Sequence, residues 1–388
     1  MTSSSRGVVL LLFLPLIITA QVVRVVRLDS TATRGDSNNN NLTAAQTDLT
    51  HLVVDEQSGR VYVAGLNHLY QLTSDLLVER SVVTGPQDDS IYCSARGSCQ
   101  QDVEKVPTDN HNKALLLDTV ERTLVACGSL YQGICEKYVL EDIGKKWPTV
   151  QVPLVPNDAG SSSVAFIAPG LPEARSHRVL YVAASHTQLG PYRSQEEIPA
   201  ISSRSLKSHE IIRARRFVQA RIKIASQFLE TFRIRYVAGF YEDGYAYFFT
   251  IQPANADNLD EGFVSKLVRV CANDPSFESY MEVTLTCQSK GTKYNLVQSV
   301  DVVQPDRQLA DRLKLTRNEK IVVAAFAASE SRGDQPKASC GLCLFTMPDV
   351  KDAFERNAQM CFSANRPNRG LGFIAGANLA CPKVTYLN

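Results

Sequence analysis

The stretch HLVVDEQSGRVYVAG (residues 51–65) decides the fold, because it joins two apolar, β-branched runs through a turn rich in Asp and Gly. This is the pattern of a β-hairpin. Related apolar runs recur along the chain and can be aligned on a Val-Ala pair. The successive copies are 62, 57, 55 and 86 residues apart and fall at Val63, Val125, Val182, Val237 and Val323. The sequence therefore contains a repeat built from strands, with one insertion.

Strand repeats of this length predict an all-β fold, a β-propeller whose blades are small four-stranded sheets. An array of β-sandwich domains is the alternative, but each sandwich would need a longer unit. A propeller must close into a ring, because the faces of each blade are buried only against its neighbours. Five copies could form a complete five-bladed ring or part of a larger one.

The N-terminus predicts secretion. A basic residue precedes the apolar run VVLLLFLPLIITA, so residues 1–20 have the layout of a signal peptide that is cleaved after Ala20. The alternative is an uncleaved membrane anchor, but the run is shorter than the roughly 20 residues that a spanning helix needs. Residues 21–47 are expected to form a disordered polar lead-in, with a glycosylation sequon at Asn41.

Ten cysteines in a secreted chain indicate disulfides first and metal or catalytic thiols second. Cys127 and Cys135 are separated by seven residues, whereas zinc knuckles separate their first ligand pair by about two to four. A disulfide across a turn is therefore favoured. The CGLC stretch at residues 340–343 has the spacing of a thiol oxidoreductase, but the LFTM that follows predicts a strand. That redox chemistry needs a helix N-terminus, so one structural cysteine with a near neighbour is expected instead.

The composition gives little support for several functions. A formal net charge of +1 supplies no argument for binding nucleic acid or membranes. The sequence lacks the motifs of zinc metalloproteases, α/β-hydrolases and P-loop proteins, and no cofactor or metal is expected. The enzyme alternative is a secreted five-bladed glycosidase with Asp55, Asp118 and Asp243 as its carboxylates. Each lies in a turn-like setting, where Asp caps the bend, so a structural role is preferred.

The stretch RARRFVQARIK (residues 213–223) concentrates positive charge in an otherwise balanced chain. Such a patch is either a contact for an acidic partner protein or a sulfated glycan, or a solvated strand face. Its aromatic residue favours contact, because aromatic residues beside arginines are typical interface anchors. The candidate contact residues are Arg213, Arg215, Arg216, Phe217 and Arg221.

Four stretches together resemble the sema domain of the plexins, cell-surface receptors for semaphorins: DLTHLVVDEQSGRVYVAGLNHLYQL, LVACGSLYQGICEKY, PAISSRSL and SKLVRVCANDPSFESYMEV. The resemblance runs from about Asp48 to Cys381. It implies a seven-bladed propeller with about five blades present, so that residues 48–388 form a sema domain that is incomplete at its C-terminus. Two apolar sheet faces would then be exposed, and the chain alone is expected to be poorly stable or part of a longer receptor.

The resemblance also implies a set of disulfides. Cys271 resembles a family cysteine whose partner lies beyond the end of this sequence, and Cys340 has no family counterpart. A substitute bridge between these two is conceivable if their Cα atoms lie within about 7 Å. The implied pairs are Cys93 with Cys99, Cys127 with Cys135, Cys287 with Cys343, and Cys361 with Cys381.

For function, the resemblance implies extracellular recognition of a semaphorin rather than catalysis, leading to transmembrane signalling in axon guidance and cell migration. In the family, one rim of the propeller meets the propeller of the semaphorin. The stretch around Phe217 resembles that rim, and Val384 is expected near it. A homodimer or a co-receptor is left open, and membrane attachment would come only through C-terminal parts absent from this chain. A soluble decoy that binds ligand without signalling is a further alternative.

Overall fold

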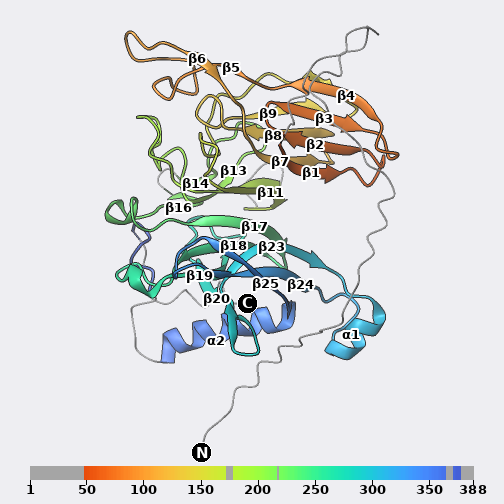
Figure 1. The fold of residues 1–388 in the computed structure, drawn as a ribbon, viewed down its shortest axis with the longest axis vertical. Helices are drawn as coiled ribbons and strands as arrows, with labels where there is room; N and C mark the ends of the chain where they lie inside the picture. The colour runs from red at the N-terminus through yellow and green to blue at the C-terminus, as the bar shows by residue number, and fades with distance from the viewer. Residues whose placement is uncertain (1–47, 172–177, 216–217, 364–369, 377–388) are drawn as a thin grey trace, which may run out of the picture. The chain divides into compact units, whose positions relative to one another are not determined.

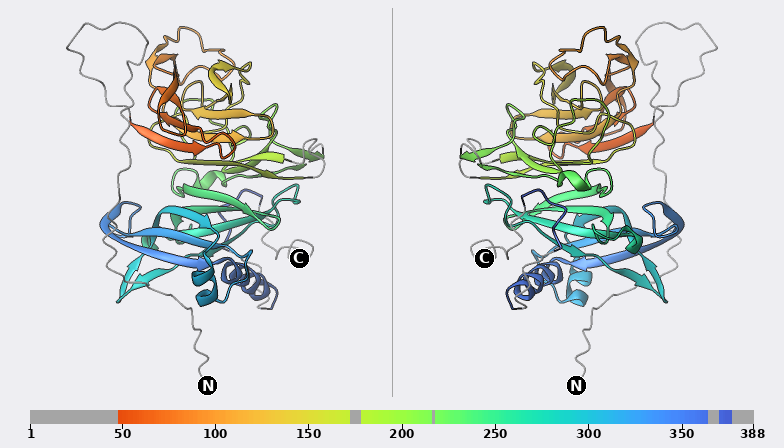
Figure 2. Two further views of the ribbon diagram at one scale, coloured as in Figure 1. Left: turned by 90° about the vertical axis from the view of Figure 1, so that its right-hand side faces the viewer. Right: turned by 90° about the vertical axis from the view of Figure 1, so that its left-hand side faces the viewer.

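The computed structural model describes residues 48–171, 178–215, 218–363 and 370–376. Contacts divide the chain into two compact units, one within Thr19–Arg221 and the other within Ile222–Asn388. Strands dominate both units (Figures 1 and 2). The chain is therefore nearly all-β, as the hairpin pattern predicts. The predicted signal peptide, the lead-in and Asn41 lie outside the described residues.

The described part of the N-terminal unit contains three four-stranded sheets. The first contains β1 (Leu49–Val54), β2 (Val61–Gly65), β3 (His68–Leu72) and β4 (Val78–Val83). The second contains β7 (Asn112–Asp118), β8 (Thr123–Gly128), β9 (Cys135–Val139) and β10 (Asp142–Lys146). The third contains β11 (Ser163–Pro169), β12 (Arg178–Ala184), β13 (Ile201–Arg204) and β16 (Arg221–Ile222). Two-stranded ribbons join β5 (Gln87–Asp89) to β6 (Val106–Thr108), and β14 (Arg213–Arg215) to β15 (Val218–Gln219).

The C-terminal unit is built from two larger sheets with helices beside them. One sheet contains β17 (Arg235–Glu242), β18 (Tyr245–Pro253), β19 (Phe263–Cys271) and β20 (Met281–Thr284). The other contains β23 (Leu296–Val303), β24 (Ile321–Ser329) and β25 (Pro336–Thr346). The smaller elements are the ribbon of β21 (Cys287–Ser289) and β22 (Thr292–Tyr294), the helices α1 (Arg307–Leu313) and α2 (Met347–Ser363), and the 3-10 turns η1 (Ser226–Phe228) and η2 (Leu259–Glu261).

Each of the five Val-Ala copies lies in a different sheet of the described residues. Four copies, on β2, β8, β12 and β24, occupy the second strand of their sheet in chain order. The copy at Val237 instead lies on β17, the first strand of its sheet. In that sheet the second strand is β18, which is almost wholly buried and carries aromatic residues in place of Val-Ala. The repeat therefore follows the sheets, although one copy is displaced by a strand.

Burial of both faces explains the uninterrupted apolar run in β8. Leu124 and Ala126 pack in one cluster with Tyr62 of the first sheet, and Val125 packs in another with Val182 of the third sheet. A sheet that is covered on both sides needs apolar residues at consecutive positions rather than at alternate ones. The second sheet thus lies between two others, as a propeller blade does.

The core of the C-terminal unit joins its two sheets to α2. Tyr247 of β18, Phe326 of β24 and Phe354 of α2 belong to one buried cluster. The buried guanidinium of Arg269 lies between two rings, 4.2 Å from the centroid of Tyr245 and 4.4 Å from that of Phe354. Cation–π contacts of this kind fix the position of the helix against the sheet.

Ion pairs in the N-terminal unit join the end of the first strand of one sheet to the start of the second strand of the next. Asp55, which follows β1, accepts a hydrogen bond from Nη1 of Arg122, directly before β8, at 3.2 Å. Asp118 ends β7 and accepts from Nη1 of Arg178, the first residue of β12, at 2.6 Å. Both carboxylates are almost fully buried, with 1% and 3% of their side chains exposed.

The C-terminal unit contains an equivalent pair. Glu242 ends β17 and lies 2.7 Å from the Nζ atom of Lys320, which directly precedes β24. The basic residue that opens the Val-Ala strand in several copies therefore has a recurrent partner. That partner is the acid that closes the first strand of the preceding large sheet.

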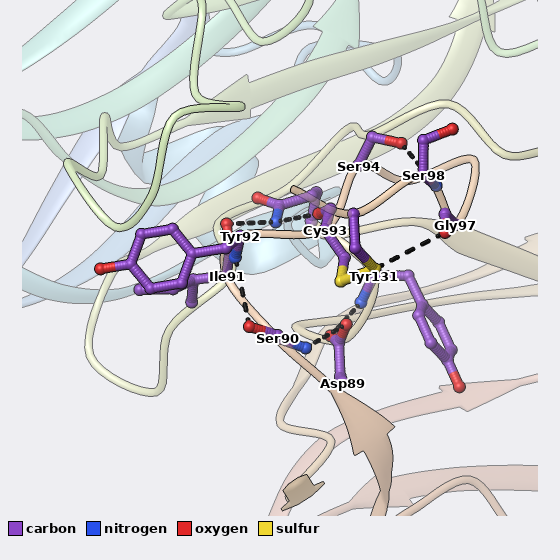
Figure 3. The surroundings of a disulfide bond; sticks show 11 residues. Asp89, Ser90, Ile91, Tyr92, Cys93, Ser94, Gly97, Ser98 and Tyr131 are labelled. Atoms are coloured by element: carbon purple, nitrogen blue, oxygen red, sulfur yellow. Dashed lines mark hydrogen bonds between the residues drawn. A yellow bond between two sulfur atoms is a disulfide. The ribbon is translucent and has the colours of Figure 1, made fainter. Parts of the chain in front are cut away.

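Three disulfides occur among the described cysteines, and they are pairs that the resemblance implies: Cys93–Cys99, Cys127–Cys135 and Cys287–Cys343. The first closes a small loop after β5 (Figure 3). Asp89 joins this loop to the turn between β8 and β9, because its carboxylate accepts from the backbone N–H of Tyr131 at 2.6 Å. The same carboxylate also accepts from the N–H of Ser90 at 2.8 Å.

The remaining cysteines separate into two groups. Cys271 and Cys340 are free thiols, so the conceivable substitute bridge between them is wrong. Cys271 ends β19, whereas Cys340 lies on β25, where it is exposed. The CGLC stretch lies on this strand, and its second cysteine bonds to Cys287. The strand predicted after it is confirmed as far as Thr346, but Met347 already begins α2. Cys361 is disulfide-bonded, and its predicted partner Cys381 lies outside the described residues.

Apolar side chains remain exposed on the first and the last large sheet. Leu52 and Val54 of β1 are 61% and 46% exposed. Their antiparallel partners, Val63 and Val61, place them on the face of the sheet opposite Tyr62. Leu342 of β25 is 65% exposed. These positions are where further sheet contacts would bury apolar surface.

We predict that the buried ion pair supports the N-terminal unit more than an exposed one supports the C-terminal unit. Asp118→Asn removes the charge that faces Arg178 while leaving an oxygen for the backbone N–H groups of Val120 and Glu121. It should lower the free energy of unfolding by about 2 kcal/mol. The measurement is chemical denaturation followed by circular dichroism.

The matched control is Asp243→Asn. Asp243 is 59% exposed and pairs with Lys351, so its loss should cost no more than about 1 kcal/mol. Asn also tolerates the left-handed backbone at this position, where φ is 46°. Equal destabilisation by the two substitutions would contradict the role given to Asp118.

A second prediction concerns acid. Burial raises the pKa of the Asp55 carboxyl, but the hydrogen bond from Ser58 and the charge of Arg122 outweigh burial, so the pKa lies below its ordinary value of 3.8. The carboxylate therefore contributes stability above that pH, and the contribution is lost as the pH falls through the folded-state pKa. Asp55→Asn should show a shallower loss of stability between about pH 4 and pH 2 than the natural chain. Urea midpoints measured across this range check the prediction, and parallel curves would contradict it.

Candidate partner-binding surface

The predicted basic stretch forms a hairpin beside the third sheet of the N-terminal unit. β14 and β15 pair antiparallel, with Arg213 opposite Gln219. Arg213 is an exposed residue. The hairpin is joined to β13 through backbone hydrogen bonds: Ile212 N–H donates to Ser203 O at 2.8 Å, and Ser203 N–H donates to Ala220 O at 2.9 Å.

Arg221 has an acidic partner that the local sequence does not reveal. Its Nη2 atom lies 2.5 Å from a carboxylate oxygen of Glu196, and its Nη1 donates to the backbone carbonyl of the same residue at 3.0 Å. Only 15% of the Arg221 side chain is exposed. Its charge is therefore partly neutralised, and the residue anchors the base of the hairpin. No signal near Arg221 could predict this, because Glu196 lies in a separate loop.

Several predicted contact residues cannot be placed as side chains. Arg216, Phe217 and Val384 lie outside the described residues, and Arg215 is described as part of β14 only. The structure therefore brings Arg213 and Arg221 to one hairpin and its base. The assignment of all six residues to a partner surface stays a prediction.

A buried arginine that sequence reasoning missed supports the loop before the hairpin. Arg204 ends β13 and is 1% exposed. Its guanidinium donates Nη1 to the carbonyl of His209 at 3.1 Å, Nη2 to that of Glu197 at 2.5 Å, and Nε to Oγ of Ser202 at 2.9 Å. Burial lowers the pKa of Arg204 to about 9. Three oxygen acceptors thus hold a cation inside the unit and connect two loops.

The three candidate glycosidase carboxylates lie in or next to turns, which is the structural role that the sequence favoured. Asp55 accepts from Ser58 Oγ at 2.6 Å, and Asp118 accepts from two backbone N–H groups of its own turn. Each also forms an ion pair with an arginine and is almost fully buried. Asp243 is exposed in the β17–β18 turn and pairs with Lys351.

The part of the chain that the structure describes offers neither a metal site nor a membrane-spanning helix. No group of three or more His, Cys, Asp or Glu side chains there could hold a metal ion. Among the described helices, none has the length and apolar character needed to cross a membrane.

Comparisons with known proteins identify relatives of this chain. No family model matches the chain. Plexin-A3 from Homo sapiens is 32% identical over 348 residues, which is 85% of this chain and 18% of that protein. Plexin-A4 from Homo sapiens is 31% identical over 332 residues, or 80% of this chain and 17% of that protein. The chain thus spans less than a fifth of the length of these relatives.

Comparison with solved structures also finds a plexin. The full extracellular region of plexin A4 superposes with a TM-score of 0.70 at 30% identity, covering 81% of this chain and 36% of that one. Drosophila Semaphorin 2a gives a TM-score of 0.51 at 17% identity over 80% of this chain and 49% of its own, a likeness of fold alone.

The antiparallel sheets and these similarities define a β-propeller of the sema type. The chain is a homologue of the plexins and corresponds to part of their extracellular region. The matched part of the plexins is the sema domain, a receptor domain rather than an enzyme, so the glycosidase alternative based on Asp55, Asp118 and Asp243 is set aside.

Proposed function

We propose that this chain is the ligand-binding part of a semaphorin receptor and that it recognises the propeller of a semaphorin protein. Homology to plexins over 85% of the chain carries the proposal. In a longer receptor, binding would lead to transmembrane signalling in cell guidance. The ligand would be met outside the cell.

The hairpin β14–β15 is the candidate site of this contact. It joins an exposed cation, Arg213, to a base that is anchored by backbone hydrogen bonds and by the Arg221–Glu196 pair. Rigid anchoring lowers the entropy that a binding loop loses on association. A basic hairpin would be steered toward an acidic surface on its partner. Binding residues commonly lie on such connections, which a rigid scaffold positions.

The test is the affinity of the secreted chain for immobilised semaphorin extracellular regions. Arg213→Glu reverses an exposed charge without burying it, and we expect the dissociation constant to rise about tenfold or more. Most of the change should be in the association rate, because exposed charges act mainly through steering. The effect should shrink as salt is added, since a Debye length of about 8 Å already applies at physiological ionic strength.

Lys337→Glu is the matched control, because Lys337 is also exposed and basic but lies on β25. It should leave the affinity within about twofold if the hairpin is the contact. If both substitutions weaken semaphorin binding equally, the hairpin is not the contact. The receptor assignment would still stand. Absence of binding to every semaphorin tested would reject the assignment itself.

A further inference from the structure

His209 is enclosed in the turn between β13 and β14. The residue is 1% exposed, and neither of its ring nitrogens has a hydrogen-bond partner among the described residues. Its backbone lies in the left-handed region, at φ 58°, and its N–H donates to the carbonyl of Ser205 at 2.9 Å. The ring is therefore held in place by its backbone and its packing rather than by polar contacts.

Two cations face this ring from neighbouring elements. Lys137 comes from β9 and donates its ammonium group to the carbonyl of Leu206 within the turn. Arg204 comes from β13 and donates Nη1 to the carbonyl of His209 itself. Both cations are committed to backbone carbonyls of the turn, so they hold the turn closed and oppose a third positive charge there.

The acids near this cluster act on the cations rather than on the ring. Glu197 acts on Arg204, which also feels the charge of Arg221, and Asp118 and Glu121 act on Lys137. The charges that act on His209 are those of the two cations, and both are positive. Burial, followed by the charges of Lys137 and Arg204, lowers the pKa of His209 to about 3. The ring is thus neutral in the closed turn.

We propose that His209 makes the turn at residues 205–210 an acid-sensitive latch, which opens in mildly acidic surroundings and loosens the hairpin β14–β15. The turn lies directly beside the residues that lead into the hairpin. Ser205 N–H donates to Glu210 O at 2.9 Å, and Arg204 bridges to Ile211 immediately before the hairpin begins. Proton uptake requires the ring to leave its enclosure, and the segment that carries the ring leads into β14.

The sign of the effect follows from linkage. An exposed ring titrates near its ordinary pKa of 6.5, so the open turn binds a proton in mild acid that the closed turn does not bind. The histidine therefore destabilises the closed turn as the pH falls below about 6.5, and the effect levels off only near the low pKa of the buried ring. Between pH 7 and pH 5, opening should become about 25-fold more frequent.

The experiment is amide hydrogen exchange of the full secreted chain at pH 7 and pH 5, corrected for the intrinsic exchange rates at each pH. Peptides spanning residues 205–212 contain His209 as their one histidine. Their protection should fall about 25-fold at pH 5. Protection that is the same at both pH values would overturn the proposal.

A matched pair of substitutions assigns the effect to this ring. His209→Gln keeps a polar planar side chain that does not titrate, and the two pH values should then agree within about twofold. His111→Gln removes a half-buried histidine from another turn and should keep the full pH dependence. Acid sensitivity that survives His209→Gln would overturn the proposal.

A measurement on the unsubstituted chain keeps the proposal testable if His209→Gln does not fold. Exchange at the C2 hydrogen of the histidine ring, read in the same peptides, reports the protonation of His209 directly. The exchange rate should show no inflection between pH 5 and pH 8. An inflection near pH 6.5 would show a freely titrating ring and would overturn the latch. None of these readouts uses a semaphorin, so the outcome is independent of the proposed function.

Discussion

Burial of both faces of the second sheet is the constraint on which the N-terminal unit depends. Leu124 and Val125 are neighbours in sequence, yet they enter different cores, because successive strand residues point to opposite faces. Apolar burial is non-directional and leaves the rotation of one sheet on the next loosely defined. The buried pair between Asp118 and Arg178 adds direction, because a charged hydrogen bond at 2.6 Å tolerates little displacement.

The C-terminal unit also combines apolar burial with an ion pair, although the residues differ. In the C-terminal unit, Glu242 and Lys320 join two sheets that share one apolar cluster. Arg269 adds a second polar constraint there, but its partners are the rings of Tyr245 and Phe354 rather than a carboxylate. A repeated fold thus preserves the apolar strand and the acid–base pair more faithfully than it preserves the neighbouring residues.

The candidate surface depends on groups beneath it. The hairpin β14–β15 is short, and its backbone is held by β13 and by the turn that contains His209. Arg204 links that turn to the Glu197 loop through carbonyl oxygens alone. Because these contacts are to backbone atoms, they fix the course of the chain and leave the exposed side chains free to vary. The exposed residues of the proposed surface can then differ without changing its support.

Part of the site could be found from the sequence and part could not. The concentration of arginines marked residues 213–223 as a unit, because charge density is visible locally. The partner of Arg221 was invisible, since Glu196 reaches it only through the loop that folds beside β16. Arg204 and His209 gave no signal either, because burial of a polar side chain depends on elements from elsewhere in the chain, such as β9.

The sequence by itself determined the all-β class, the hairpins and the five-fold recurrence of an apolar strand. These follow from short apolar, β-branched runs bounded by turn residues, which act over a few positions. It also indicated that the residues directly after CGLC lie on a strand. Only the tertiary structure decided that Val237 lies on the first strand of its sheet, that Cys271 and Cys340 remain free, and that the strand-end acids meet the arginines of the next sheet. Those outcomes depend on which strands pack together, and packing joins residues that local pattern cannot relate.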